Sequence, residues 1–574
     1  MHIGWSTNLS FFLSLFFSQV LATSEQFDEE LTLRPLQDGK LAARFSFTTL
    51  LKGATPRNPE CLASDDESQH YTLFPLALGQ ILREYAVTEL HLSLNAGNWN
   101  YDKWGYPDEP GVGTGAELWV WMGDGAPISV DDRWQGLRNA LAGLFCASLG
   151  SLDEQRTTSP TLSFQPEGSL PDWKAPHQLR HATLPSEHVC TENLTPFLKL
   201  LPCKSLSGIA RLLNPHRLFD ADWHGLGVDV RYHQNAGVEV RLTFQAVFDP
   251  VRLSPNKRRD WSLDSIFDRT IDRACPVAHS SEVRVELPGE KLYTLSPDPS
   301  VIIEDLAIFV VKDSASCPCD ISSFVSGADH RLVAEDALDI AMQWPGEATF
   351  SYPLFAAAEP LTHISVQRTL KGSSQSDARL SLVITNNLPV QVQTGYLETM
   401  PWLAQFYIHT LRVRSDGVSR DDLVTIISYA APVPHARPTL FQAALTLPPK
   451  STLEVTMDVL KPFLRYTEHP PDALRGWDLP PAVLGPFSFG NLSEADLNVS
   501  AAALTTLRRR PRRIYTSTLL VDLATPDFSM PYNVIIISCT LIALIFGSVF
   551  NLLTRKFVVV SVENESGAGK SDLS

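Results

Sequence analysis

The sequence predicts a mainly β protein with some α-helix: β-sandwich-type domains outside the cytosol, the N-terminal one carrying helices, followed by one transmembrane helix. Three observations lead to this fold class. Short segments of alternating apolar residues recur along the chain, 41 prolines interrupt them, and one long uncharged apolar run lies near the C-terminus. Alternation is typical of half-buried strands, and proline separates such strands at turns.

The clearest strand pattern occupies residues 362–470, which we interpret as a β-sandwich. Seven short apolar segments follow one another there with turn residues between them, at the spacing that sandwiches show. These segments are 364–372, 378–387, 390–398, 406–414, 423–431, 439–449 and 451–460.

The N-terminal part contains both the alternating apolar pattern of strands and the apolar spacing of helices. Alternating patterns predict strands, and apolar residues at helical spacing predict helices. We expect helices within 72–86 and 131–149. We expect strands at 41–50, 88–94, 116–122, 161–166, 227–233, 238–248 and 281–287.

Both ends of the chain carry membrane-targeting signals. Residues 534–553 contain no charge, and twenty residues at about 1.5 Å per residue cover the hydrocarbon core of about 30 Å. Arg555 and Lys556 follow, as on a cytosolic flank. The shorter apolar run within residues 9–20 reads as a cleaved signal peptide. The basic run 508–513 argues for the reverse orientation, but a cleaved signal already commits that side to translocation.

These signals divide the chain into six parts. We predict a signal peptide (1–22), an N-terminal lumenal β-rich domain with helices (23–245), a C-terminal lumenal β-sandwich region (246–505), a juxtamembrane segment (506–532), a transmembrane helix (533–553) and a cytosolic tail (554–574).

Composition and motifs exclude several function classes. A formal charge of −17 argues against nucleic acid as a partner. The chain has no phosphate-binding loop, no G-x-S-x-G elbow and no H-E-x-x-H helix. Cys317 and Cys319 are too closely spaced for a zinc module. The sequence therefore predicts no catalytic residue, no metal site and no cofactor.

The cysteine count points to another chain. Of eight cysteines, Cys539 lies in the apolar run, which leaves seven on the oxidising side. An odd number suggests a free thiol or a bond to another chain. Asn193, Asn491 and Asn498 begin glycosylation triplets on the same side.

Two clusters admit a functional reading beside a structural one. Cys190 with His181 and His188 could form a nucleophile and base, although a structural or disulfide-bonded cysteine is the commoner case. The tryptophans could stack on sugars, although such clusters more often fill a core or a subunit contact. They are Trp99, Trp104, Trp119 and Trp121.

The segment before the apolar run, 522–533, is short, polar and contains two prolines. It differs from a flexible Gly/Ser-rich linker. Two interpretations remain open: an interfacial anchor formed by Phe528 and Tyr532, or a contact with a lipid headgroup or a neighbouring membrane subunit.

Three motifs in combination resemble the PIG-T family, a subunit family of the GPI transamidase complex. They are TPDFSMPYN at 525–533 with NLLTR at 551–555, VCTENLTPF at 189–197 with LLPC at 200–203, and GAELWVW at 115–121. The resemblance runs from the signal peptide to the end of the apolar run. The tail after it departs from the family pattern.

The resemblance implies a non-catalytic subunit in the endoplasmic reticulum membrane, a single-pass type I protein. Its complex replaces a C-terminal signal peptide of a protein with a GPI lipid. The implied partners are the caspase-like catalytic PIG-K subunit, GPAA-type, PIG-S and PIG-U subunits, and the GPI lipid itself.

The family motifs also imply residue roles. The cysteine at position 190 corresponds to one that forms an interchain disulfide with the catalytic subunit. Asp527, Ser529 and Asn533 correspond to the segment where the GPI lipid lies. A further family contact is expected in the loop 471–477, but Ala473, Leu474 and Arg475 depart from a polar amide there. The alternatives are a lumenal glycan-binding chaperone that uses the tryptophans and a thiol hydrolase that uses Cys190.

Overall fold

The structure is a computed structural model that describes residues 25–64, 70–289, 292–312, 337–352, 360–372, 374–465, 468–469, 476–489, 512–524 and 529–560. The predicted signal peptide and most of the predicted cytosolic tail lie outside the described residues, as do Asp527, Asn491 and Asn498. The chain divides into two compact units. The first, which we call the body, ends at Leu523; the second joins residues 464–474 to 524–574.

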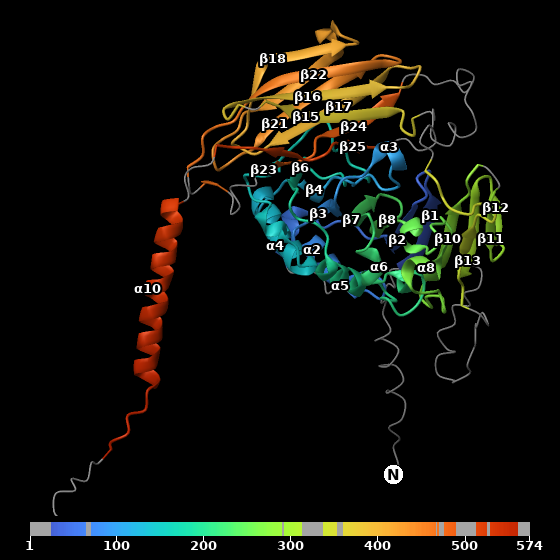
Figure 1. Cartoon of the computed structure of the whole chain (residues 1–574), viewed down its shortest axis with the longest axis horizontal. Coiled ribbons are helices and arrows are strands. Elements are labelled where there is room, and N and C mark those ends of the chain that lie inside the picture. The colour runs from blue at the N-terminus through green and yellow to red at the C-terminus, as the bar shows by residue number, and fades with distance from the viewer. Residues whose placement is uncertain are drawn as a thin grey trace, which may run out of the picture. The chain divides into compact units, whose positions relative to one another are not determined.

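An eleven-stranded sheet, the N-terminal sheet, forms the centre of the body (Figure 1). All neighbouring strands in it are antiparallel except β1 and β10. Its order is β12 (Val301–Ile303), β13 (Leu306–Lys312), β10 (Ser280–Glu286), β1 (Glu25–Pro35), β2 (Leu41–Lys52), β8 (Gly237–Phe248), β7 (Trp223–His233), β3 (Val87–Ala96), β4 (Gly115–Gly123), β6 (His177–Leu184) and β5 (Thr157–Thr158). This sheet extends past residue 246, where the sequence analysis placed a domain boundary.

Helices cover one face of the N-terminal sheet and share a large apolar core with it. They are α2 (Leu76–Glu84), α4 (Val130–Phe145), α5 (Thr191–Leu200), α6 (Pro215–Leu218) and α8 (Leu263–Phe267). In α4 the Ser129 hydroxyl accepts a hydrogen bond from the backbone N–H of Asp132 at 3.1 Å, which caps the helix. Its apolar side chains then recur at helical spacing and are buried, from Trp134 through Leu137 to Leu141.

Two five-stranded sheets form the C-terminal sandwich. One has the order β15 (Ile364–Lys371), β16 (Asp377–Asn386), β22 (Ser451–Leu460), β18 (Gln405–Ser415) and β19 (Val418–Ser419). The other has the order β20 (Val424–Ala430), β21 (Thr439–Leu447), β17 (Val392–Met400), β24 (Val483–Phe489) and β25 (Ile514–Tyr515). The predicted sandwich is confirmed, and each of its seven predicted segments contains a strand.

The sandwich lies against the face of the N-terminal sheet that the helices leave free. A second apolar core joins the two parts there, with Trp119 and Trp223 from the N-terminal sheet and Leu397, Val483 and Tyr515 from the sandwich. The short helices α3 (Tyr101–Trp104) and α7 (Pro250–Leu253) lie in the loops between the strands of the N-terminal sheet.

Two small sheets complete the body. One joins β11 (Thr294–Ser296), β14 (Ala341–Gln343) and β9 (Trp261–Ser262), and the other is the ribbon of β23 (Trp477–Leu479) with β26 (Leu519–Val521). The second unit contains α10 (Ser529–Thr554). The mainly β fold with helices in its N-terminal part and one apolar helix near the C-terminus is confirmed.

One predicted strand, 161–166, is absent because side chains occupy its backbone donors. The N–H groups of Thr161 and Leu162 donate to the side-chain oxygen of Gln442 at 2.9 and 3.0 Å. The N–H groups of Glu167 and Gly168, which follow, donate to Glu89, both at 2.8 Å. A backbone satisfied in this way has no need of a strand neighbour.

Candidate functional site

Two of the three predicted lipid contacts lie where α10 begins. Ser529 is the first residue of this helix, and Asn533 stands one helical turn later with an exposed side chain. Among the described residues, one helix is long and apolar enough to cross a membrane, Tyr532–Thr554. The predicted transmembrane helix at 533–553 is therefore confirmed as a candidate span, and the bulk of the chain lies on one side of it.

The segment 512–523, which we call the strap, leads from the sandwich toward this helix. It is held to the body along its length. The first contact is Arg513, whose side chain is 6% exposed and pairs with Glu167 at 2.8 Å. Its guanidinium lies over the ring of Trp119, 4.9 Å from the centroid, and over Phe164 at 5.3 Å. A cation stacked on two buried rings and paired with a carboxylate is held firmly.

The next contacts bind the strap to both parts of the body. The Tyr515 hydroxyl donates to Glu117 on β4 at 2.5 Å, and the Tyr515 N–H donates to the Tyr101 hydroxyl at 3.0 Å. Thr516 exchanges two hydrogen bonds with Ala482: its N–H donates to the Ala482 carbonyl, and its hydroxyl accepts from the Ala482 N–H. These contacts fix the strap between the N-terminal sheet and the sandwich.

The sandwich core supplies a further contact. Arg368 on β15 is fully buried and donates to the backbone carbonyls of Pro480 at 2.8 Å and Ser517 at 3.3 Å. The same guanidinium pairs with Glu398, which also accepts a hydrogen bond from the Tyr396 hydroxyl at 2.7 Å. Through these bonds, the buried Arg368 holds both the loop that follows β23, at Pro480, and the loop that precedes β26, at Ser517.

The strap ends in the ribbon. Trp477 lies opposite Val521, and Leu479 lies opposite Leu519. The Lys461 ammonium donates to the carbonyl of Asp522 at 3.3 Å, and Leu523 is buried. The last residue of the body before the membrane helix is thus part of the folded structure.

A buried charge network lies behind Arg513. The ring of His91 stacks on Trp119 with centroids 3.8 Å apart, and its nitrogens contact Asp229 at 2.5 Å and Glu89 at 3.0 Å. Burial alone would lower the pKa of His91, but the hydrogen bonds to these two carboxylates outweigh it and raise the pKa.

The pKa of Glu167 is likewise set by burial acting against neighbouring charges, which here are cations. Burial acts to raise its pKa, but Arg513 and the other cations around it outweigh that effect and lower the pKa to about 2. Arg231 pairs with it at 2.8 Å and Arg512 at 2.7 Å. Glu167 is therefore an ionised carboxylate at which three arginines meet.

Sequence reasoning missed these strap contacts. It treated the basic run 508–513 as a signal of orientation, whereas the structure buries Arg513 in the body. A signal was present: the apolar pair Ile514–Tyr515 follows directly, and a basic run that ends in such residues can enter a core. The carboxylate partner, 346 residues earlier in the chain, had no local signature.

The tryptophans fill the core rather than a sugar site. Trp99, Trp104 and Trp119 are buried, and Trp121 is partly buried against the same cluster. Trp99 meets Trp104 and Trp223 edge to face at 5.2 and 4.9 Å. The glycan platform loses its basis, because a buried ring face cannot stack on a sugar.

Cys190 caps the N-terminus of α5 with its thiol exposed. Its backbone N–H donates to the Asn193 side-chain oxygen at 2.6 Å, which fixes the residue while leaving the sulfur accessible. His181, proposed as a base for a thiol hydrolase, is buried and pairs with Glu117 at 3.0 Å. His188 Nδ1 donates to the Asn95 carbonyl at 3.2 Å, so this ring nitrogen is engaged with the backbone rather than with Cys190.

Asn193 has a structural role. Its amide nitrogen donates to the carbonyls of Phe145 at 2.9 Å and Cys146 at 3.3 Å, and its oxygen accepts from Cys190. The side chain is 1% exposed. Because a glycan on this nitrogen would have to replace bonds inside the fold, we do not retain Asn193 as a glycosylation candidate.

A disulfide links the segment after α5 to the segment before β10. Cys203 and Cys275 are bonded, whereas Cys61, Cys146 and Cys190 are free and exposed. Cys317 and Cys319 lie outside the described residues. The sequence had left the pairing open.

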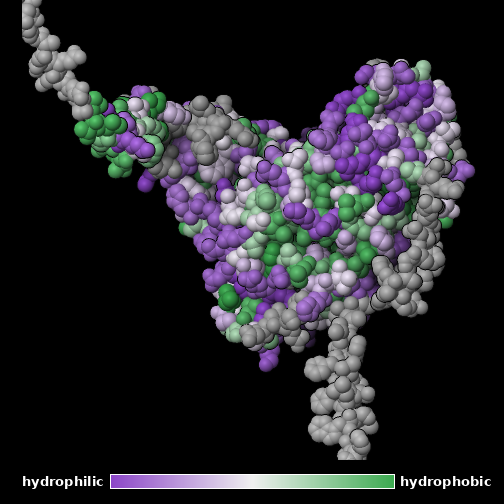
Figure 2. All heavy atoms as spheres, turned by 90° about the horizontal axis from the view of Figure 1, so that it is seen from below, coloured by the Kyte–Doolittle hydropathy of each residue, from purple (hydrophilic) through white to green (hydrophobic). Residues whose placement is uncertain are grey.

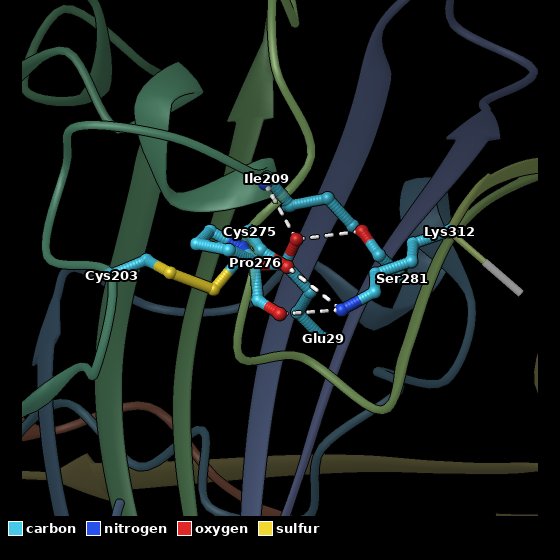
Figure 3. Close-up of a disulfide and its surroundings, with 7 residues drawn as sticks. All are labelled: Glu29, Cys203, Ile209, Cys275, Pro276, Ser281 and Lys312. Atoms are coloured by element: carbon cyan, nitrogen blue, oxygen red, sulfur yellow. Dashed lines mark hydrogen bonds between the residues drawn. A yellow bond between two sulfur atoms is a disulfide. The ribbon is translucent and has the colours of Figure 1, made fainter. Parts of the chain in front are cut away.

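A buried carboxyl lies beside this disulfide (Figure 3). Glu29 on β1 accepts from the Ser281 hydroxyl at 2.6 Å and from the Ile209 N–H at 3.1 Å. The Lys312 ammonium donates to the Pro276 carbonyl at 2.6 Å rather than to Glu29. Burial outweighs the hydrogen bonds and raises the pKa of Glu29 to about 7.

The raised pKa of Glu29 should make the stability of the fold depend on pH. The folded chain keeps this proton up to about pH 7, while the unfolded chain releases it above about 4.5. The free energy of unfolding should therefore fall as the pH rises from 4.5 to 7, by about 1.4 kcal/mol per unit at most. Glu29→Gln should remove this decline and be more stable at pH 8 by about 3 kcal/mol. Denaturant unfolding at several pH values measures it; a decline that persists in Glu29→Gln would assign it to other groups.

Comparison with known proteins decides the family. The family model described as "Gpi16 subunit, GPI transamidase component" matches residues 10–259 and 252–573. The chain belongs to this family of GPI transamidase components. It is 34% identical over 547 residues to the GPI-anchor transamidase component PIGT of Mus musculus, covering 92% of this chain and 89% of that protein. The human protein of the same description is also 34% identical, with 92% and 90% covered.

A more distant relative confirms the family over the same length. The GPI transamidase component GPI16 of Saccharomyces cerevisiae is 29% identical over 570 residues, covering 93% of this chain and 89% of that protein. The resemblance inferred from the three motifs is thereby confirmed. As a GPI transamidase component, the chain works with the other subunits of that complex.

Proposed function

We propose that this chain is the non-catalytic subunit that holds the caspase-like catalytic subunit and helps to place the GPI lipid in the endoplasmic reticulum membrane. The exposed thiol of Cys190 is the observation that carries the first role. Asn193 fixes the backbone of Cys190 at the start of α5, and the cysteine is exposed and forms no disulfide within the described residues. This supports a disulfide to the catalytic subunit.

The surface around α5 supports a protein contact. Leu206, 76% exposed, and Val277, 44% exposed, flank the Cys203–Cys275 disulfide just beyond the end of this helix. Figure 2 views the side where α5, α6 and α8 lie, and shows apolar surface in the middle of that face with polar residues around it. Apolar surface with a polar rim is typical of a protein interface.

Replacing Cys190 tests the covalent contact. In Cys190→Ser, the disulfide-linked band that contains both subunits should disappear on non-reducing electrophoresis of the purified complex. Cys61→Ser and Cys146→Ser, which also remove exposed free thiols, should retain the band. A linked band that persists in Cys190→Ser would overturn the assignment. The thiol-hydrolase alternative instead requires an alkylatable thiol at this position in the complex.

The second role is placement of the lipid, for which we propose Asp527, Ser529 and Asn533. Ser529 begins α10 and Asn533 follows one helical turn later, so these polar residues stand next to the start of the candidate span at Tyr532. The strap supports this role because it holds the chain to the body up to Leu523. Placement of this kind accelerates transfer by proximity.

A single polar residue tests the lipid contact. Asn533→Leu should lower attachment of GPI to a reporter protein several-fold while the complex purifies intact, because one polar partner of the lipid is lost. Asn551→Leu, at the other end of the same helix, is the matched control and should leave attachment unchanged. Equal losses in both variants would indicate a general requirement of the helix instead.

A further inference from the structure

Two large apolar side chains are exposed at the end of the body from which the chain leaves for the membrane. Phe463 is 74% exposed and Leu520 is 55% exposed. The hydrogen bond from Lys461 to the Asp522 carbonyl joins their two segments, and each side chain lies two residues from this bond. Phe463 and Leu520 therefore belong to one edge of the body, which we call the foot.

The foot is folded, so this exposure is not that of a loose chain. Lys461 is 7% exposed, and Val521 and Leu523 are 2% and 5% exposed. Leu520 lies opposite Asp478 in the ribbon. Burying a Leu or Phe side chain is worth about 1.5–3 kcal/mol, and both side chains forgo this gain in the body itself.

Chain length limits how far the foot can be from the bilayer. Six residue steps separate Leu523 from Ser529, and an extended chain covers about 22 Å in six steps. Three helical residues more, about 5 Å, lead to Tyr532, where the candidate span begins. Whatever the angle of the helix, Leu523 at the end of the body lies within about 27 Å of the edge of the hydrocarbon core.

The residues of the foot suit the interfacial layer of a membrane. Phe463 is an exposed aromatic residue, and the exposed Arg465 lies two residues further along the chain, whereas Lys461 and Leu464 are buried. Aromatic rings at headgroup level and basic residues near lipid phosphates are typical of membrane surfaces.

We propose that Phe463 and Leu520 insert into the lipid headgroup layer on the N-terminal side of the span. The body then contacts the membrane at two places, the helix and the foot, and its tilt about the helix is restricted. This inference stands apart from the lipid contact proposed at α10, because it concerns ordinary membrane lipid and different residues.

Photo-crosslinking tests the foot. The photoreactive amino acid p-benzoylphenylalanine is placed at position 463, 520 or 418 in the full chain, and the assembled complex is irradiated in membranes. Val418 is the control, since it is 65% exposed and lies on β19 at an edge of the same sandwich. All three positions are exposed, so the substitutions should leave folding intact, which co-purification of the other subunits checks.

Mass spectrometry of the adducts decides the outcome. We expect lipid adducts at 463 and 520 several-fold above those at 418. Adducts to peptides of another subunit at 463 and 520 would overturn the proposal and make the foot a protein contact. Lipid adducts no more frequent than at 418 would also overturn it. Loss of the GPI contact in Asn533→Leu has no bearing on either result.

Discussion

Replacing Arg368 by Met should destabilise the body by about 3–5 kcal/mol, because the change leaves Glu398 buried without its cation. Both side chains are fully buried. Burial already raises the pKa of Glu398 against the opposing effect of Arg368. Without Arg368 the pKa must rise further, so the carboxyl takes up a proton at neutral pH.

The destabilisation should therefore depend on pH. Above about 4.5 the unfolded chain gives up the Glu398 proton while the folded variant retains it, so stability should fall with rising pH by about 1.4 kcal/mol per unit. Denaturant unfolding of the full chain in detergent between pH 5 and 8 measures this slope. The double variant Arg368→Met, Glu398→Gln lacks the acid and should not show the additional slope.

The double variant should still lose part of the stability. Arg368 also donates to the carbonyls of Pro480 and Ser517, and neither Met nor Gln restores those bonds. Protease cleavage near residue 517 should accordingly increase in both variants. If the free energy of unfolding changes with pH in the same way in the single and double variants, protonation of Glu398 does not cause the additional pH dependence.

The local sequence patterns predicted where most strands lie, but they did not predict which side chains contact one another between strands. The alternation in 451–460 matches β22 residue for residue, since alternate side chains of this strand are buried. The segment 161–166 carried a similar pattern, yet the side chain of Gln442, 280 residues after Leu162, accepts from its N–H groups. A single sequence does not reveal which side chain approaches from 280 residues away.

The candidate site was predictable in part for the same reason. The apolar run is a local feature and predicted α10. Asn533 and Cys190 were instead proposed from the family motifs, and the odd number of cysteines agrees with the proposal for Cys190. Arg513 and Arg368 act through partners brought together by the packing of the sandwich on the N-terminal sheet. Their partners had no local signature, and arginine is seldom buried unless it is paired.

Replacing Arg513 by Leu should cost about 3 kcal/mol, since a buried cation that pairs with Glu167 and stacks on two rings is lost. Its neighbour offers a matched control. Arg512 pairs with the same carboxylate at 2.7 Å, but its side chain is 62% exposed. Arg512→Leu should therefore cost less than about 1 kcal/mol. Thermal or denaturant unfolding of the full chain compares the two.

Arg513→Leu should also loosen the strap. Hydrogen exchange should increase at Tyr515 and in the facing strand β4, where Glu117 accepts the Tyr515 hydroxyl. Arg512→Leu should leave exchange there unchanged. Equal effects of the two arginines on stability and exchange would mean that burial at position 513 contributes nothing to holding the strap.

If the strap is released, the chain between the folded body and Ser529 grows by up to eleven residues, from 513 to 523. The body would then no longer be held within the short distance that six residue steps allow, and placement of the lipid by proximity would weaken with it.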